Sequence, residues 1–417
     1  MAGGAKQAVQ LVLNVGSSSI KYALYRSNAP AAAGAVHFQR LVQGLAEGIG
    51  TGGHELIKHE TEQGKKKHKV PLPDHKTALN TVMELLPQDV LKGIESVGHR
   101  VVHGGESFHE AAVVDSKVIA AIETASVLAP LHNPWGLLGI RASSEVFGPS
   151  VPQVAVFDTA FHQTMEPHAF LYALPYELYQ KHGIRKYGFH GTSYKYVLQR
   201  TAEVLGKPAE EVNCIICHIG NGASMAAIKN GKCVDTTMGL TPLEGLVMGT
   251  RTGDIDPAVP MHLMSNLGYT AQEVNDLLNK KSGLLGLCGT SDDREIEQRT
   301  FDKEPVGTLA KKVQVHRMRK YLGAYMVALD GELDALVFAG GMAEKSHLLR
   351  TLVCENLGRL GLTLDEARNQ AEGGRFSANT PIHSEAAANA GGAQIWVVPT
   401  DEELCIAQQA HALVHAV

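Results

Sequence analysis

The sequence predicts an α/β protein of two lobes, both built from one duplicated unit. Residues 11–26 hold an apolar run, a polar turn from Gly16 to Ser19, and a second run in which apolar and polar residues alternate. This periodicity is typical of two half-buried strands joined by a tight turn. Residues 214–228 repeat the design about half a chain later, with a Gly-rich turn from Gly220 to Ser224. Such a recurrence indicates an internal duplication.

Length and composition set further bounds. The chain has 417 residues, of which 44% are hydrophobic and 19% charged, enough to bury a sizeable core in two or three domains. The net charge of −5 gives no general attraction to nucleic acids or anionic membranes, so we expect neither as a partner. No apolar run approaches the roughly 20 residues of a spanning helix. The first ten residues lack a signal-peptide pattern, so we expect a cytoplasmic protein.

Cysteine usage agrees with a reducing compartment. The six cysteines are scattered along the chain, which favours free thiols over a disulfide framework. Cys214, Cys217 and His218 match the CxxCH pattern of haem attachment, but they lie in an apolar run that predicts a buried strand. We reject a haem site here, because buried cysteine behaves as a small hydrophobe.

The turn after the first apolar run is a candidate anion site. Gly16 permits backbone conformations that other residues resist, and Ser17 and Ser19 add hydroxyl groups to the backbone donors of the bend. If the second run is a strand, Ser19 and Lys21 share a face. These donors and one lysine suit a chain of phosphates. The alternative is an ordinary serine-rich hairpin turn, and this stretch alone does not separate the two.

The patterns that follow predict the rest of the first half. Residues 36–45 predict a third strand, and the polar residues 46–72 an exposed strand or loop. Asp74 is placed to cap a helix whose apolar stripe ends at Pro87. A strand over residues 94–106 carries Arg100 near its end.

Two helices come next, over residues 116–129 and from there to about residue 147, separated by the helix-stopping sequence APLHNP. Residues 151–162 predict a buried strand that ends at Asp158. Ligands collect at strand ends in α/β folds, so Asp158 stands where a functional group is expected. Thr192 or Ser193 is predicted to cap the following helix.

The second half continues in the same alternation. Residues 235–256 hold too much Gly and Thr for a regular element and predict an ordered loop, and long loops of this kind tend to be functional. Later stretches predict a long helix over residues 305–330, and a strand, Gly-Gly turn and helix start over residues 333–346. A last strand and helix follow, with Thr400 and Glu403 spaced as a capping box.

Nine stretches together resemble a known family. NVGSSSIKY, HIGNGAS and FAGGMAE resemble the two phosphate motifs and the adenosine motif of the superfamily of acetate and sugar kinases, heat-shock chaperone ATPases and actin. GHRVVHGGE, APLHNP, VFDTAFHQTM, RKYGFHGTS, MGTRTGDIDP and PTDEEL narrow the resemblance to the acetate kinase family. The match runs from about residue 9 to about residue 410 with the family's spacing.

The resemblance implies a fold and a reaction. The fold is the two-lobed, duplicated ribonuclease H-like α/β fold of that superfamily, with lobes at residues 1–155 plus 400–417 and at residues 156–399, in a homodimer. The reaction is reversible phosphoryl transfer between ATP and acetate, giving ADP and acetyl phosphate by direct in-line attack. The cofactor is Mg²⁺, for which Mn²⁺ is able to substitute.

The resemblance also assigns residues. Those around the transferring phosphoryl group are Arg100, His132, Asp158, His190 and Arg251. Those of the two phosphate loops are Ser17, Ser19, Lys21, His218, Gly220, Asn221 and Gly222. Those of the adenosine loops are Asp292, Asp293, Arg294, Gly340, Gly341, Met342, Ala343 and Glu344. The acetate pocket takes Val102, Leu131, Phe189 and Pro242 beside Arg100, and the metal site takes Asn14 and Glu402.

Three departures from the family pattern bear on the nucleotide pocket. Tyr194 stands where His is usual, Thr252 where Ser is usual, and AGGMAEK where AGIGEN is common. Three other functions stay open: a kinase for propionate or butyrate, an acetate kinase that uses pyrophosphate, and a nucleotide-gated interaction protein of the actin or chaperone kind. The last would have no use for two arginines, a histidine and an apolar acyl pocket together.

Overall fold

The computed structural model describes residues 8–28, 36–130 and 132–415. The chain divides into two compact units: Met1–Phe161 with Asp401–Val417, and His162–Thr400. The first unit is therefore assembled from both ends of the chain, and each unit is described by itself below.

The first unit contains one sheet of eight strands in the order β5-β4-β3-β2-β1-β6-β8-β7. Its strands are β1 (Ala8–Gly16), β2 (Ser19–Asn28), β3 (His37–Glu47), β4 (Leu56–Thr61), β5 (Gly64–His68), β6 (Ile94–Val101), β7 (Ala112–Val113) and β8 (Gln153–Phe157). Its helices are α1 (His75–Leu85), α2 (Gln88–Leu91), α3 (Ser116–Ala125), α4 (Asn133–Phe147) and α16 (Glu402–His415). The predicted strand over residues 94–106 is thus shorter, because Val101 is followed by a Gly-containing loop.

The second unit contains a sheet of six strands in the order β11-β10-β9-β12-β14-β13. Its strands are β9 (Cys214–Ile219), β10 (Ala223–Lys229), β11 (Lys232–Thr236), β12 (Ala335–Ala339), β13 (Thr380–Pro381) and β14 (Gln394–Val397). Its helices are α5 (Pro167–Phe170), α6 (Tyr176–His182), α7 (Gly191–Leu205), α8 (Ala258–Leu267), α9 (Ala271–Lys280), α10 (Gly283–Cys288), α11 (Asp293–Phe301), α12 (Pro305–Ala328), α13 (His347–Cys354), α14 (Glu366–Gln370) and α15 (Glu385–Asn389).

The two sheets share one topology, so the predicted duplication is confirmed. In each sheet, three antiparallel strands in sequence order (β1 to β3, and β9 to β11) are extended by two parallel strands from later in the chain. The added strands are β6 and β8 in the first unit and β12 and β14 in the second. This is the duplicated ribonuclease H-like arrangement expected from the sequence.

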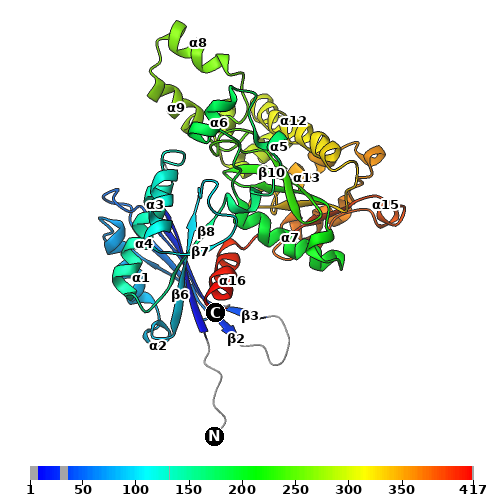
Figure 1. The fold of residues 1–417 in the computed structure, drawn as a ribbon. Helices are drawn as coiled ribbons and strands as arrows, with labels where there is room; N and C mark the ends of the chain where they lie inside the picture. The colour runs from blue at the N-terminus through cyan, green and yellow to red at the C-terminus, as the bar shows by residue number, and fades with distance from the viewer. Residues whose placement is uncertain (1–7, 29–35, 131, 416–417) are drawn as a thin grey trace. The chain divides into compact units, whose positions relative to one another are not determined.

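The alternation of β1 divides its side chains between two helical layers. Leu11 and Leu13 pack in the core formed with α1, whereas Val12 lies in a second core with Ile406 and Ala410 of α16. Figure 1 shows α1, α3 and α4 on one face of this sheet and α16 on the other. Successive strand residues point to opposite faces, and both faces of β1 are buried, which explains its continuous apolar run.

The helix that follows each set of strands in the sequence packs against the sheet made by the other set of strands. α7 follows the first repeat in sequence but contacts β9 and β12, and α16 follows the second repeat but contacts β1 and β6. A side-chain methyl at Gly98 of β6 would lie 2.5 Å from Cγ2 of Ile406, so this glycine allows the close approach of α16. The C-terminal helix is therefore part of the first unit's core.

Two predicted helix caps are wrong. His190, with a φ of 57°, precedes α7, so Thr192 and Ser193 lie within its first turn. Asp401 caps α16 by accepting a hydrogen bond from the backbone N–H of Leu404 at 2.9 Å. Both predicted hydroxyl caps fail because their side chains make tertiary hydrogen bonds, which local spacing does not reveal.

Asp74 does cap α1, accepting a hydrogen bond from the backbone N–H of Thr77 at 2.7 Å. The six cysteines are buried free thiols, and Cys214 and Cys217 lie in β9 as predicted. Every helix in the described parts of the chain is too short or too polar to cross a membrane.

Candidate active site

Arg100 is the centre of the candidate site residues in the first unit. It lies near the end of β6, and Asp158 directly follows the neighbouring parallel strand β8. Carboxyl ends of parallel strands meet at one sheet edge, which brings the two side chains together. Nη2 of Arg100 donates to Oδ2 of Asp158 at 2.7 Å, and Nε lies 3.2 Å from both carboxylate oxygens.

Glu402, at the start of α16, is the second carboxylate at Arg100. Its Oε2 lies 3.8 Å from Nη1 of Arg100. Burial raises the pKa of Glu402, the charge of Arg100 opposes that rise, and Asp158 adds to it. Burial works against the charge of Arg100, but the two carboxylates outweigh it and raise the pKa of Arg100. The guanidinium therefore stays charged, and it is oriented by Asp158 at Nε and Nη2 and by Glu402 at Nη1.

A loop fastened to α4 follows Arg100 in the chain. Nδ2 of Asn133 donates to the carbonyl of His103 at 2.8 Å, and the backbone N–H of His103 donates to Oδ1 of Asn133 at 3.0 Å. Val102 is half-buried in this loop, and His132 directly precedes α4. The candidate pocket residue Leu131 lies outside the described residues.

The serine turn confirms the predicted hairpin. β1 and β2 pair antiparallel, with Gly16 opposite Ser19 and Asn14 opposite Lys21. Ser17 is exposed and Asn14 and Ser19 are partly exposed, so their polar groups are accessible within this unit.

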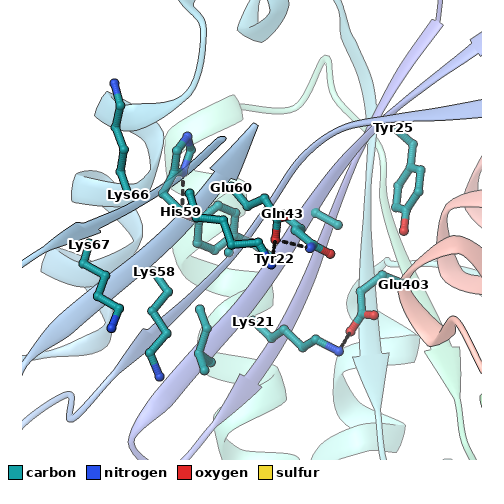
Figure 2. A pocket seen from close by; sticks show the side chains of 14 residues that line it. Lys21, Tyr22, Tyr25, Gln43, Lys58, His59, Glu60, Lys66, Lys67 and Glu403 are labelled. Carbon is teal, nitrogen blue, oxygen red and sulfur yellow. Dashed lines mark hydrogen bonds and ion pairs between the residues drawn. The ribbon is translucent and has the colours of Figure 1, made fainter. Parts of the chain in front are cut away.

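Lys21 forms an ion pair with Glu403, in which Nζ and Oε1 are 2.6 Å apart. Figure 2 shows the two side chains pointing toward each other beside a cavity over β2, β3, β4 and β5. The cavity has a volume of about 350 Å³, and Lys58 and Lys67 line it farther along the sheet. The sequence did not predict Glu403 as the partner of Lys21, because only the folded position of α16 brings them together.

In the second unit, a histidine and an arginine both approach Gly222. A side-chain methyl at Gly222 would lie 3.3 Å from Nε2 of His190 and 3.7 Å from Nη1 of Arg251. Nη1 of Arg251 also donates to the carbonyl of Pro242 at 2.8 Å. The second Gly-rich turn thus leaves space where two side-chain nitrogen atoms converge.

The rings of His190 and His218 lie against each other, with centroids 4.2 Å apart. His218 belongs to β9, and the buried Phe189 precedes His190. The carbonyl of Phe189 is held by Nε2 of His162 at 2.8 Å. Sequence reasoning did not find His162, because it lies in a short turn with no recognisable spacing to the others.

Both adenosine-loop stretches and the second phosphate turn line one cavity of about 510 Å³. Its predicted residues are Gly220, Asn221, Asp292, Asp293, Arg294, Gly341 and Met342, and those the sequence missed are Ser291, Glu297, Lys345 and Arg375. Burial raises the pKa of Glu297, whose carboxylate accepts a hydrogen bond from Ser346. The structure therefore brings three separate stretches together, as expected for one binding site.

Three predicted residues of the adenosine turn shape it without lining the cavity. Ala343 is fully buried, and Gly340, with a φ of 84°, packs against the backbone of Ile219. Oε1 of Glu344 accepts hydrogen bonds from the backbone N–H groups of Gly340 at 2.9 Å and of Thr400 at 3.1 Å. Burial raises the pKa of Glu344, and these two donors oppose the rise.

Comparison with known proteins decides the family. The family model for the acetokinase family matches residues 9–408. The chain belongs to the acetokinase family. It is 46% identical to the acetate kinase of Dictyoglomus turgidum over 406 residues, covering 96% of both chains. It is 47% identical to the acetate kinase of Thermotoga maritima over 419 residues, covering 98% of this chain and 99% of the other.

Two solved structures superpose on almost the whole chain. The acetate kinase of Porphyromonas gingivalis gives a TM-score of 0.87 at 41% identity, covering 98% of this chain and 100% of that one. A propionate kinase of Francisella tularensis gives the same TM-score and identity, covering 97% and 99%. The acetokinase relationship therefore extends through both units and every candidate site residue.

Proposed function

We propose that this protein catalyses reversible phosphoryl transfer between ATP and acetate, producing ADP and acetyl phosphate. The observation that carries the proposal is Arg100, oriented by Asp158 and Glu402 at one sheet edge. Membership of the acetokinase family and the names of the full-length relatives support this reaction. The two compact units serve as the two lobes of the enzyme.

Acetate needs no general base in this reaction. A carboxyl group in water ordinarily has a pKa of about 4, so acetate is already ionised at neutral pH. Asp158 already accepts hydrogen bonds from Arg100, so its role is to orient the guanidinium. The obstacle is the approach of one anion to another, and a fixed cation lowers that barrier.

Arg100 and Arg251 supply this positive charge. A guanidinium is planar and permanently charged, and it binds two oxygens of a phosphoryl group at once. His190 adds an N–H donor from the second unit. Because these groups act by position and charge, acetate attacks phosphorus directly, the bond to the leaving ADP breaks, and no phosphoenzyme forms.

The donor set fits Mg²⁺. Asn14 and Glu402 offer oxygen ligands, which this hard cation prefers, and a buried carboxylate with a raised pKa gains from a divalent cation nearby. The described residues contain no group of three or more His, Cys, Asp or Glu side chains placed as a metal site. Asn14 and Glu402 would hold the ion, which would neutralise part of the phosphate charge when bound.

ATP is the proposed phosphoryl donor. The 510 Å³ cavity reaches from the phosphate turn at Gly220 and Asn221 to Gly341 and Met342, which gives room for a base and a ribose beyond the phosphates. The test is a coupled assay in both directions with purified protein, offering ATP or pyrophosphate and acetate, propionate or butyrate. Higher rates with pyrophosphate or with butyrate would overturn this assignment.

Propionate phosphorylation is the second candidate function, because a full-length structural relative is a propionate kinase. We propose Val102, Leu131, Phe189 and Pro242 as the wall of the acyl pocket. One methylene is worth only about 1–3 kcal/mol in discrimination. Propionate should therefore react with a lower kcat/KM than acetate, and Val102→Ala should narrow the gap.

We also propose a homodimer that buries α8. This helix is apolar, yet it has no buried residue, and Met261 and Leu267 are 62% and 59% exposed. Exposed apolar clusters of this kind mark interaction surfaces. Light scattering should give twice the mass of the chain, and Met261→Glu should give the monomer mass.

A further inference from the structure

The imidazole of His190 ends a chain of two buried hydroxyl groups. Oγ of Ser224 lies 2.8 Å from Nδ1 of His190 and 2.5 Å from the phenolic oxygen of Tyr194. Ser224 and Tyr194 are both fully buried. This arrangement comes from two elements, because Tyr194 lies in α7 and Ser224 in β10.

The imidazole of His218 ends a second chain of the same kind. Oγ of Ser193 lies 2.8 Å from Nδ1 of His218 and 2.7 Å from Oγ1 of Thr400. Ser193 is fully buried. Each of the two adjacent, tilted rings therefore has a serine hydroxyl at Nδ1, and each serine has a further hydroxyl behind it.

We propose that these two hydroxyl chains hold His190 and His218 as neutral imidazoles with the proton on Nε2. Ser224, Tyr194, Ser193 and Thr400 then act as positioning residues, through the rings and without touching substrate. The inference rests on the proposed function for its catalytic meaning, because a proton on Nε2 of His190 makes that atom a donor beside Gly222 and Arg251.

The direction of the hydrogen bonds favours this tautomer. A phenol is more acidic than an aliphatic hydroxyl, so Tyr194 is the stronger donor of its pair with Ser224. Burial also raises the pKa of Tyr194 and keeps its proton in place. Ser224 then accepts from Tyr194 and donates its only proton to Nδ1 of His190, which leaves the ring proton on Nε2.

The same order fits the second chain. Thr400 donates to Ser193, and Ser193 donates to Nδ1 of His218, so each hydroxyl uses its proton in the chain. With centroids 4.2 Å apart, two protonated rings would repel each other. A neutral pair avoids that repulsion and still presents Nε2 donors.

The direct test is NMR of the full chain with ¹⁵N-labelled histidine. Long-range correlations between ring protons and nitrogens distinguish the two neutral tautomers, and His190→Gln and His218→Gln spectra assign the signals. At pH 7.5 we expect the Nε2–H form for both rings. A proton on Nδ1 of His190, or a charged His190–His218 pair, would overturn the proposal.

Variants test the serine and the phenol separately. Ser224→Ala and Tyr194→Phe should change the His190 signals toward the other tautomer, with Ser224→Ala the larger effect, and should leave those of His218 nearly unchanged. Partners that orient metal-bound histidines are worth roughly 10–100-fold, and we expect a fall of similar size in kcat here, with little change in KM. Unchanged His190 signals in Ser224→Ala would overturn the proposal.

Thr201→Val is the matched control. Thr201 carries a fully buried hydroxyl in α7, which donates to the helix carbonyl of Val197 at 2.7 Å. It should leave the spectra of both rings unchanged. An inactive wild type with Nε2–H rings would refute the proposed reaction alone, whereas an active wild type with Nδ1–H rings would refute this inference alone.

Discussion

Arg100 illustrates why a single side chain can matter for both stability and catalysis. It is held by Asp158, which is almost fully buried, and by Glu402. Removing one partner of a buried ion pair is strongly destabilising, because the other charge remains without compensation. Arg251 donates to the backbone carbonyl of Pro242 in the second unit.

We expect both arginines to be needed for catalysis, and Arg100 to be needed for stability as well. Arg100→Ala and Arg251→Ala should each lower kcat by roughly 10³-fold, the scale of phosphoryl-transfer arginines. Arg100→Ala should also lower the melting temperature by several degrees, because it leaves Asp158 and Glu402 without their cation. Lysine should restore little activity at either position, because it lacks the fork.

Steady-state kinetics and thermal melts of the four variants check this prediction. Arg141→Ala is the control, since Arg141 forms an exposed ion pair with Glu123. Near-normal kcat for either alanine variant with an intact fold would exclude that arginine from the active site.

We expect the protein to lose stability in mild acid because of His99 in β6. It is fully buried, Nε2 lies 2.8 Å from Oε1 of Gln153, and burial lowers the pKa of His99 to about 4. The unfolded value is near 6.5. The unfolded state therefore binds a proton first, so stability present above pH 6.5 falls as the pH drops toward 4, by roughly 3 kcal/mol for this group.

Urea unfolding at pH 7 and pH 5 measures the effect. His99→Gln removes the titrating group, so the difference in unfolding free energy between the two pH values should shrink relative to the wild type. An identical pH dependence in both proteins would show that His99 is not neutral in the folded state.

The candidate site could be predicted where chemistry coincides with local pattern. Arg100 and Asp158 end neighbouring strands, and such ends are visible in the sequence. Glu403 and Ser224 were missed as partners of Lys21 and His190, because those pairs are 382 and 34 residues apart in the chain. Contacts at such separations leave no periodic signal.

At the scale of elements, the turn after β12 separates the roles of two adjacent glycines. A side-chain methyl at Gly340 would lie 2.8 Å from the backbone N and O of Ile219, and its φ is 84°. At Gly341 no heavy atom lies within 4 Å, and Gly341 lines the 510 Å³ cavity. The backbone of the turn therefore requires Gly340, whereas Gly341 leaves space for a ligand.

Gly341→Gln should fill this space, raise the KM for ATP strongly and leave the binding of acetyl phosphate and the melting temperature nearly unchanged. Gly340→Ala should lower the melting temperature, because both its φ and its contacts exclude a side chain. Kinetics and thermal melts of both variants provide the comparison. A large loss of stability in Gly341→Gln with an unchanged KM for ATP would show that Gly341 is needed for the turn and not for ligand binding.

Element boundaries were less predictable than the elements. The sequence PTDEEL offers Thr400 and Asp401 as caps one residue apart, and both satisfy the local rule. Thr400 instead bonds Ser193, which leaves Asp401 as the cap of α16. Tertiary contacts decide between caps that are locally equivalent.

At the scale of the whole molecule, α16 brings the C-terminal end of the chain into the core of the first unit. α16 buries Ile406, Ala407 and Ala410 in one core with strands of the first unit, at about 1.5–3 kcal/mol for a large apolar side chain such as Ile406. It also carries Glu402 and Glu403. The first unit is therefore incomplete without the last residues of the chain.

Truncation after Thr400 should expose the α16 face of the first sheet and leave the second unit's sheet paired. Hydrogen exchange measured by mass spectrometry should show lost protection in β1, β6 and β8 and retained protection in β9 and β12. Removal of residues 416–417 is the control and should change neither. Full protection of β1 and β6 in the longer truncation would contradict the role assigned to α16.

The position of α16 also orders events on the ribosome. The first unit's strands emerge early, but their missing helix is translated only after the 239 residues of His162–Thr400. At about 5–20 residues per second, this delay is roughly 10–50 s. During that interval Val12, Val154 and Val156 have no helix over them. The unit that is synthesised first is thus the unit that is completed last, and one face of its nascent sheet stays uncovered until α16 is made.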